Sequence, residues 1–340
     1  MNRHIVLTTI LTGILLMGLG CEKEQAKVVM PPPVTAAESQ QVKPEQAVEQ
    51  PEPNLPQTPP VEPSPEQPTE VNEPQIQAAP TEPSPVAQLC DKCTQILSTY
   101  VDRQGMVDYR SLSRKKLELL DVLDIFRDFD RDRYKSLSKE DKLAFWINAY
   151  NLEFIKIILD NYPIESSRVL RLFWPPNSIQ HIKGLWDQHK FIIMDEEFTL
   201  QEIDDRFFRK EFVDPRVFFA ICYGSVSGPT LRNGAYCGQD LSNQLDEQVM
   251  SNLASGKVFR IERENQTVLL SAIFKDTWYG RQFVSKYGTD LKFKQQTPEI
   301  RAVLNFLTFY LPPQDVDFLE TGNYTVKFMG YDWTLNDRSS

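Results

Sequence analysis

The chain has 340 residues and a formal net charge of −10 at pH 7, from 37 Lys and Arg and 47 Asp and Glu. Residues 22–88 hold eleven Glu and three Lys, contributing 3 − 11 = −8, whereas residues 89–340 hold 33 basic and 36 acidic residues and contribute −3. The second part is nearly neutral and lacks the basic footprint of a nucleic-acid-binding protein, so we expect no nucleic-acid partner.

The first twenty residues have the layout of a secretory signal. A charged start precedes an apolar run from Ile5 to Leu19, which is shorter than the roughly 20 residues that a membrane-spanning helix needs. Because Cys21 follows, we predict a lipoprotein signal peptide at residues 1–20 and lipid on Cys21, although Gly18 stands where such signals usually have Leu. An uncleaved anchor helix is the alternative, and either would hold the chain at a membrane.

The next segment has the composition of a tether. Between Glu22 and Gln88 it contains sixteen of the 24 prolines and no Phe, Trp or Tyr, so it has almost nothing to bury. We predict a disordered Pro- and Glu-rich tether at residues 21–88. Every Phe, Trp and Tyr lies at Tyr100 or beyond, so we expect residues 89–340 to form a single globular domain.

Four cysteines remain if Cys21 carries lipid: Cys90, Cys93, Cys222 and Cys237. An even number in an oxidising compartment permits two disulfides, with the pairing open. The first two are separated by Asp and Lys and are expected to be disulfide partners or a free thiol pair. The chain shows no second pair that would complete a zinc site, so we predict no metal and no cofactor.

Hydrophobic periodicity and capping residues predict an ordered series of elements. Helices are expected at Leu89–Tyr100, Ser113–Asp124, Ser138–Asn161, Thr199–Lys210, Asp240–Ala254 and Thr297–Leu311. Strands are expected at Phe191–Met194, Glu197–Phe198, Arg216–Tyr223, Val258–Glu262, Thr267–Leu270, Tyr324–Phe328 and Tyr331–Leu335. Helices followed by mixed strands indicate an α+β domain. The helix from Ser138 is apolar on most sides, which predicts that it is buried.

The loop after the expected strand Arg216–Tyr223 is the first candidate site, since a buried strand that ends in a Gly and Ser loop often presents a nucleophile. Cys222 is the only cysteine there. A cysteine nucleophile needs a base, normally His, and the mature chain offers only His181 and His189. Either one of them forms a Cys–His dyad with Cys222, or both are solvated loop histidines, as their polar surroundings favour.

Several polar residues could bind a ligand. Asn148 and Asn151 lie one turn apart in the apolar helix, where burial requires hydrogen bonds, so they either pin the helix to a neighbour or line a site. Arg232 could hold a carboxylate or phosphate, or form an internal ion pair. The candidate binding residues are Asn148, Asn151, Ser225, Ser227, Arg232 and Ser271.

Four segments carry a resemblance to a known family: Ala144–Asn151, Asp214–Arg216 with the following Gly224–Arg232 loop, Leu269–Phe274 and Tyr331–Asn336. Together they resemble the domain-of-unknown-function 547 family, from about Gly105 to Asn336. The family lacks a settled activity. The resemblance implies a buried central helix packed on a mainly antiparallel sheet, similar to papain- and transglutaminase-like folds.

The chain departs from the residues that the resemblance leads one to expect. Family members usually carry a Glu-His pair after the first hairpin, a His on the strand, a Cys at its end and a second Cys before the proline. The corresponding residues here are Asp204, Asp205, Phe218, Tyr223 and Gly228. Cys222 lies one residue too early, and such a shift along a strand turns a side chain to the opposite face.

We therefore expect an exported, membrane-anchored envelope lipoprotein, facing the periplasm or the cell surface. Its domain is expected to be a degenerate, non-catalytic member of the family that binds a peptide, glycan or protein at residues 224–232. The alternative is a cysteine-type hydrolase or acyl transferase that uses Cys222.

Overall fold

The computed structural model describes residues 84–275, 284 and 286–338. The predicted signal peptide, the predicted lipidation at Cys21 and nearly all of the predicted tether lie outside the described residues. The α-helices are α1 (Pro85–Tyr100), α2 (Tyr109–Arg114), α3 (Lys116–Arg127), α4 (Arg131–Ser136), α5 (Lys139–Asp160), α6 (Leu200–Ile203), α7 (Val217–Ala220), α8 (Leu241–Ala254), α10 (Pro298–Leu307) and α11 (Pro313–Thr321). The strands are β1 (Phe191–Ile193), β2 (Glu196–Phe198), β3 (Phe259–Glu262), β4 (Thr267–Leu270) and β5 (Thr325–Phe328).

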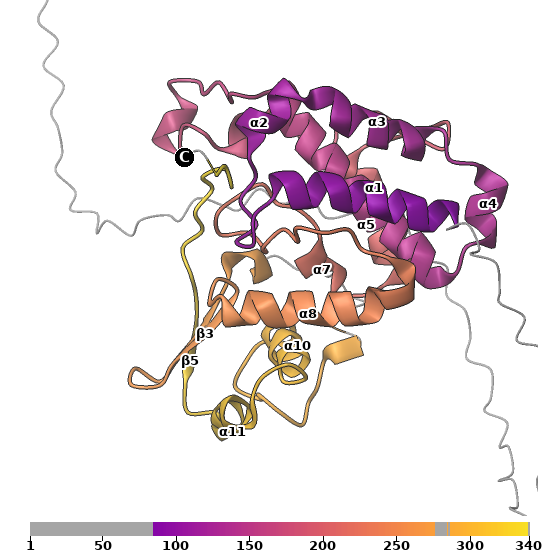
Figure 1. Ribbon diagram of the computed structural model, residues 1–340. Helices are drawn as coiled ribbons and strands as arrows, with labels where there is room; N and C mark the ends of the chain where they lie inside the picture. The colour runs from indigo at the N-terminus through magenta and orange to yellow at the C-terminus, as the bar shows by residue number, and fades with distance from the viewer. Residues whose placement is uncertain (1–83, 276–283, 285, 339–340) are drawn as a thin grey trace, which may run out of the picture.

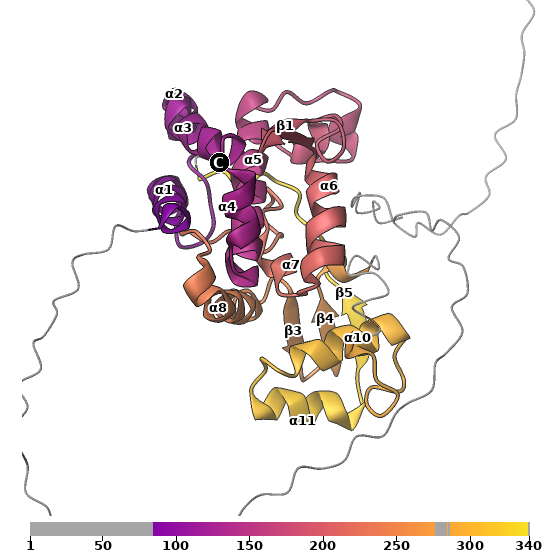
Figure 2. The same cartoon turned by 90° about the vertical axis from the view of Figure 1, so that its right-hand side faces the viewer.

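The architecture is α+β, as predicted. Helices α1 to α5 and the β1–β2 hairpin form the upper part of the molecule, whereas the three-stranded sheet with α10 and α11 forms the lower part, and α7 and α8 lie between them (Figures 1 and 2). None of the described helices is both long and apolar enough to cross a bilayer.

Helix α5 is the centre of the upper part. It begins where Ser138 accepts a hydrogen bond from the backbone N–H of Asp141 at 3.0 Å, as the sequence predicted. Of its 22 residues sixteen are buried, because α1, α3, α6 and α8 surround it. It also packs on the antiparallel hairpin, where the ring centroids of Trp146 and Phe198 lie 5.2 Å apart.

The two sheets are small. Strands β1 and β2 pair antiparallel around a turn at Met194 and Asp195, whose φ angles of 50° and 56° are typical of a type I′ hairpin turn. The second sheet has the order β3-β4-β5, with β3 and β4 antiparallel and β4 and β5 parallel. Both predicted hairpins are confirmed.

The predicted strand at Arg216–Tyr223 is wrong. Asp214 and Pro215 start a helical turn instead, since the backbone N–H of Val217 donates to the carbonyl of Asp214 at 3.1 Å. This turn continues as α7, and the chain then becomes extended at Ile221. The apolar run is typical of a buried strand, but a proline at the first turn favours helix initiation.

The predicted strand at Tyr331–Leu335 is also wrong as a regular element. Its neighbours are loops: Thr334 forms an isolated bridge with Ser178 and accepts a hydrogen bond from the backbone N–H of Val226. Without a continuous partner strand, an extended segment cannot build a ladder. The segment instead fastens the loop after α7 to the body of the domain.

Candidate functional site

The extended segment after α7 is held by a side chain of α5 rather than by a strand. The amide of Asn151 donates to the carbonyl of Ala220 at 2.9 Å and accepts from the backbone N–H of Cys222 at 2.7 Å. These two bonds are those that a neighbouring strand would supply. Asn151 is 1% exposed, so it substitutes for a sheet partner inside the core.

Asn148 binds the backbone of a second loop in the same way. Its amide donates to the carbonyl of Tyr236 at 2.7 Å and accepts from the N–H of Tyr236 at 2.9 Å. Both asparagines are thus hydrogen-bonded and pin α5 to its neighbours, as their burial predicted.

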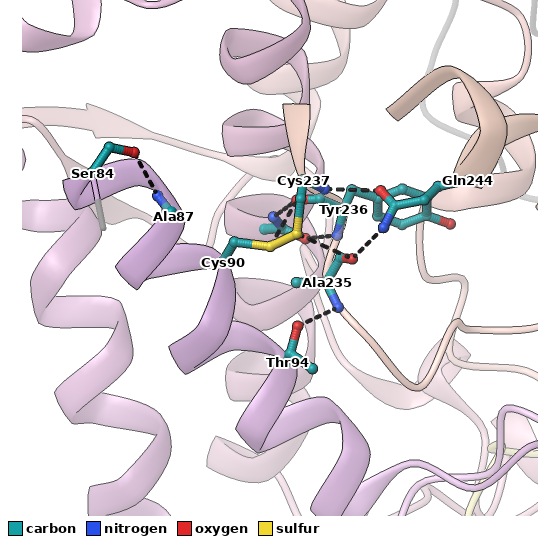
Figure 3. Close-up of a disulfide and its surroundings, with 9 residues drawn as sticks. Ser84, Ala87, Cys90, Thr94, Ala235, Tyr236, Cys237 and Gln244 are labelled. Carbon is teal, nitrogen blue, oxygen red and sulfur yellow. Dashed lines mark hydrogen bonds between the residues drawn. A yellow bond between two sulfur atoms is a disulfide. The ribbon is translucent and has the colours of Figure 1, made fainter. Parts of the chain in front are cut away.

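A disulfide between Cys90 of α1 and Cys237 fastens this second loop further (Figure 3). Thr94 accepts from the N–H of Ala235, and Gln244 accepts from the N–H of Cys237, so both sides of the loop are held. Of the four cysteines that follow Cys21, Cys90 and Cys237 form this disulfide, and Cys93 is a buried free thiol.

Cys222 lies next to the bonds made by Asn151, and its thiol is shielded from solvent. The residue is 1% exposed, and burial raises the pKa of the thiol to about 12. The tyrosines at 109, 150 and 331 lie close enough for the sulfur to influence their pKa values. A thiol with this pKa is protonated at neutral pH and is a poor nucleophile.

The two histidines belong to the connection between α5 and β1. The Nε2 atom of His181 is hydrogen-bonded to the carbonyl of Pro175 at 2.8 Å, and that of His189 to the carbonyl of Lys183 at 3.2 Å. Neither ring is among the causes of the pKa shift at Cys222. The structure therefore gives the predicted Cys–His dyad no support.

The loop at residues 224–232 uses its polar groups mainly within the domain. Ser225 is buried and its Oγ lies 2.7 Å from the hydroxyl of Tyr331, while Ser227 accepts from the N–H of Asp332 at 2.9 Å. Arg232 reaches the surface and pairs with Glu247 at 3.1 Å, with both side chains partly in solvent.

Ser271 lies apart from this loop in sequence and caps a short 3₁₀ helix, η5 (Ala272–Phe274). Its Oγ accepts from the N–H of Ile273 at 3.4 Å, and the residue is 2% exposed. Its predicted binding role stays a prediction, and its observed contact is a helix cap.

Asp204 and Asp205 lie on a π-helix, η3 (Asp204–Phe212), that continues α6. A π-helix brings residues five apart above one another. Accordingly Arg209 donates to Asp204 at 2.7 Å, whereas the oxygen of Asp205 lies 3.8 Å away. Burial nevertheless raises the pKa of Asp204 to about 6, because desolvation outweighs the attraction of Arg209. The sequence predicted an ordinary helix here and so missed this pairing.

No three His, Cys, Asp or Glu side chains gather as a possible metal site among residues 84–275, 284 and 286–338.

Comparison with known proteins gives one match, over residues 134–252, to a family described as protein of unknown function, DUF547. The match confirms the predicted resemblance to the DUF547 family over residues 134–252. The matched stretch is shorter than the predicted one from about Gly105 to Asn336. No curated protein and no solved structure matches the chain, so the likeness to papain-like folds stays a prediction.

Three of the positions that differ from the residues implied by the resemblance converge in space. The rings of Phe218 and Tyr223 lie 5.7 Å apart. A Cβ atom added at Gly228 would lie 2.9 Å from the Cβ of Tyr223, so positions 223 and 228 face each other. The His and two Cys that the resemblance implies would therefore meet at one point, which here is filled by aromatic rings.

Proposed function

We propose that this chain is a membrane-anchored envelope lipoprotein whose DUF547 domain binds a peptide, glycan or protein without catalysing a reaction. The observation that carries the proposal is the convergence of positions 218, 223 and 228. They hold Phe, Tyr and Gly, so the imidazole and the two thiols that the resemblance implies are absent from these positions.

The state of Cys222 supports the absence of catalysis. The thiol is buried, its pKa is raised to about 12, and its backbone is engaged by Asn151. Nucleophilic catalysis would require an accessible thiolate next to a base. Cys222 has the environment of a small core residue instead.

The disulfide between Cys90 and Cys237 supports export. Such bonds persist in oxidising compartments and are rare in the cytosol of most organisms. This agrees with the secretory layout of residues 1–20. The lipid on Cys21 would then hold the domain at a membrane, on a segment long enough to let it reach a partner.

Arg232 is the group at the loop best placed to meet a partner. Its guanidinium has five N–H donors, and the described contacts use one of them on Glu247. The group also lies over the ring of Tyr236, at 5.9 Å from its centroid, which fixes its direction. A carboxylate or other anionic group of a partner would displace or bridge the exposed Glu247.

The absence of catalysis is tested with the full chain and panels of ester, amide and glycan substrates. We expect no turnover above that of a heat-denatured sample, and no labelling of Cys222 by a thiol-reactive probe in the folded protein. Turnover that disappears in Cys222→Ala but persists in Cys93→Ala would overturn the proposal in favour of a cysteine hydrolase or acyl transferase.

Binding and anchoring are tested in cells. A photo-crosslinking amino acid at the exposed Asn233, beside the retained Arg232, should give a discrete adduct, whereas the same group at Leu291, which is 85% exposed, should not. Cys21→Ala should move the chain out of the membrane fraction. Equal crosslinking from both positions would count against the loop, and an unchanged distribution of Cys21→Ala would count against the lipid.

A further inference from the structure

The connection between α5 and β1 lies at the top of the molecule (Figures 1 and 2) and contains an unusual group of exposed apolar residues. Val169 is 68% exposed, Leu170 37%, Leu172 80% and Phe173 63%. Ten large apolar side chains are exposed among the described residues, and these four lie within five consecutive positions. Single exposed apolar residues are ordinary, but a contiguous group marks a contact surface. We call residues 168–173 the apolar turn.

The backbone of the apolar turn is held by hydrogen bonds. Its centre is the 3₁₀ helix η1 (Leu170–Leu172), and the N–H groups of Phe173 and Trp174 both donate to the carbonyl of Leu170, at 3.0 Å and 2.9 Å. The next residue is fixed to the body of the domain, because Trp174 packs edge-on against Trp333 at 5.8 Å. The exposed side chains are therefore displayed from a fixed base.

The charge around the apolar turn has the opposite sign to that of the chain. Residues 165–187 contain Arg168, Arg171 and Lys183 against Glu165 and Asp187, a net charge of 3 − 2 = +1, although the whole chain has a net charge of −10. Arg171 donates to the hydroxyl of Ser166 at 2.6 Å, and neither arginine forms a salt bridge with a described residue. Both guanidinium groups thus remain available to anions.

We infer that the apolar turn inserts into the interface of an anionic lipid bilayer, as a second membrane contact separate from any lipid on Cys21. Aliphatic and aromatic side chains interleaved with two arginines, with no acidic residue within 168–173, fit the boundary between acyl chains and anionic headgroups. Two arginines are too few for a purely electrostatic attachment, so the apolar side chains carry the contact and the arginines orient it.

A symmetric contact between two copies of this chain fits the same surface less well. An isologous interface would bring the apolar turn against itself and would place four arginines together, with only the Glu165 of each copy nearby to offset their charge. A bilayer with anionic headgroups neutralises the arginines while it covers the apolar side chains. The charge of the surface therefore favours lipid over a second copy.

The test measures whether residue 173 enters the bilayer. The full chain is mixed with vesicles of phosphatidylcholine that contain about 30% phosphatidylglycerol and a brominated phosphatidylcholine, which quenches tryptophan fluorescence at the level of the acyl chains. Phe173→Trp reports on the apolar turn. The matched control is Phe309→Trp, at a phenylalanine that is 70% exposed on another part of the surface. The signal of the five native tryptophans is subtracted with the unmodified chain.

We expect at least about twofold stronger quenching of the added tryptophan at position 173 than at position 309, because only the former reaches the acyl chains. Adding Arg168→Glu and Arg171→Glu, or omitting the phosphatidylglycerol, should reduce the difference. Equal quenching at both positions would overturn the inference and assign the apolar turn to a protein partner. Flotation of unmodified chain and of Cys21→Ala reports the lipid anchor separately, so either contact can fail without the other.

Discussion

The two sides of helix α5 treat buried polar groups in opposite ways. Asn148 and Asn151 face loops, and each has both its donor and its acceptor engaged by backbone groups at 2.7–2.9 Å. Glu153, two residues further on, is 4% exposed, and its Oε2 atom has no hydrogen-bond partner. Burial raises the pKa of Glu153 to about 7. One side of the helix thus stabilises the loops at Cys222 and Tyr236, whereas the other side carries a buried carboxyl that the charge of Lys156 compensates only in part.

The disulfide reinforces the hydrogen-bonded side, and its removal should have the largest effect. Cys90 and Cys237 are separated by 147 positions. Closing so long a loop lowers the entropy of the unfolded chain, and the loop-entropy estimate converts this to about 5 kcal/mol of free energy at 25 °C. We expect the double variant Cys90→Ala and Cys237→Ala to lose about 2–5 kcal/mol in the free energy of unfolding, measured by urea titration.

Reduction of the unmodified chain with dithiothreitol is the control for that measurement. It should reproduce the loss, whereas Cys93→Ala without reductant should be much less destabilised than the double variant, because Cys93 takes no part in the bond. An unchanged urea midpoint in the double variant would show that the hydrogen bonds of Asn148, Thr94 and Gln244 suffice to hold the loop.

Asn151→Ala should have the next largest effect. It leaves the carbonyl of Ala220 and the N–H of Cys222 without partners inside the core. We expect a loss of about 2–4 kcal/mol, since a buried unsatisfied polar group costs roughly 1–3 kcal/mol. The control is Asn161→Ala at the end of the same helix, where a half-buried amide makes one bond to Ile157 and should cost less than about 1.5 kcal/mol. Equal losses in the free energy of unfolding of the two variants would contradict the role of Asn151 as a substitute for a sheet partner.

Glu153→Gln should change stability in the opposite direction. The pKa is about 7 in the folded chain and about 4.5 in the unfolded chain, so both states are protonated at low pH and carry no penalty. As the pH rises from about 4.5 to about 7, only the unfolded state loses its proton, and the folded state loses about 3 kcal/mol of stability, which stays lost above pH 7. At pH 8 the variant should therefore be more stable by roughly 2–3 kcal/mol.

Asp204 adds to the same pH dependence. Burial raises the pKa of its carboxyl to about 6, so it destabilises the folded chain with the same sign as the pH rises. Urea titrations at pH 4.5 and pH 8 on Glu153→Gln, on Asp204→Asn and on the double variant separate the two contributions. If the free energy of unfolding of Glu153→Gln depended on pH as that of the unmodified chain does, the carboxylate of Glu153 would have to be stabilised by a partner group when the protein is in solution.

The comparison also shows which features the sequence could predict. Residues that act through local rules were readable: Ser138 starts α5, Thr199 and Glu202 form the capping box of α6, and both hairpins appear where alternating residues flank a turn. The burial of Asn148 and Asn151 also followed from the apolar residues around them. These features depend on spacing within one element.

The missed features depend on long-range contacts. The segment after α7 has the apolar residues of a strand, but its strand-like hydrogen bonds come from Asn151, 71 positions away from Cys222. The partner of Cys90 was equally unreadable, because it lies 147 positions further on. The π-helix that pairs Asp204 with Arg209 differs from an α-helix by one residue of register, which the sequence pattern does not encode.

Arg232→Ala should have the smallest effect on stability, and this makes it the most useful variant for function. Its ion pair with Glu247 is partly in solvent, at side-chain exposures of 27% and 59%, so it should contribute less than about 1 kcal/mol. Salt should weaken that contribution further, because exposed pairs are screened. The variant should therefore unfold at nearly the same urea concentration as the unmodified chain, and as Glu247→Ala. A loss of more than about 2 kcal/mol would show that Arg232 belongs to the hydrogen-bonded side of α5 rather than to an exposed binding surface. A stable Arg232→Ala protein that no longer competes for the partner crosslinked at position 233 would instead separate binding from folding at this loop.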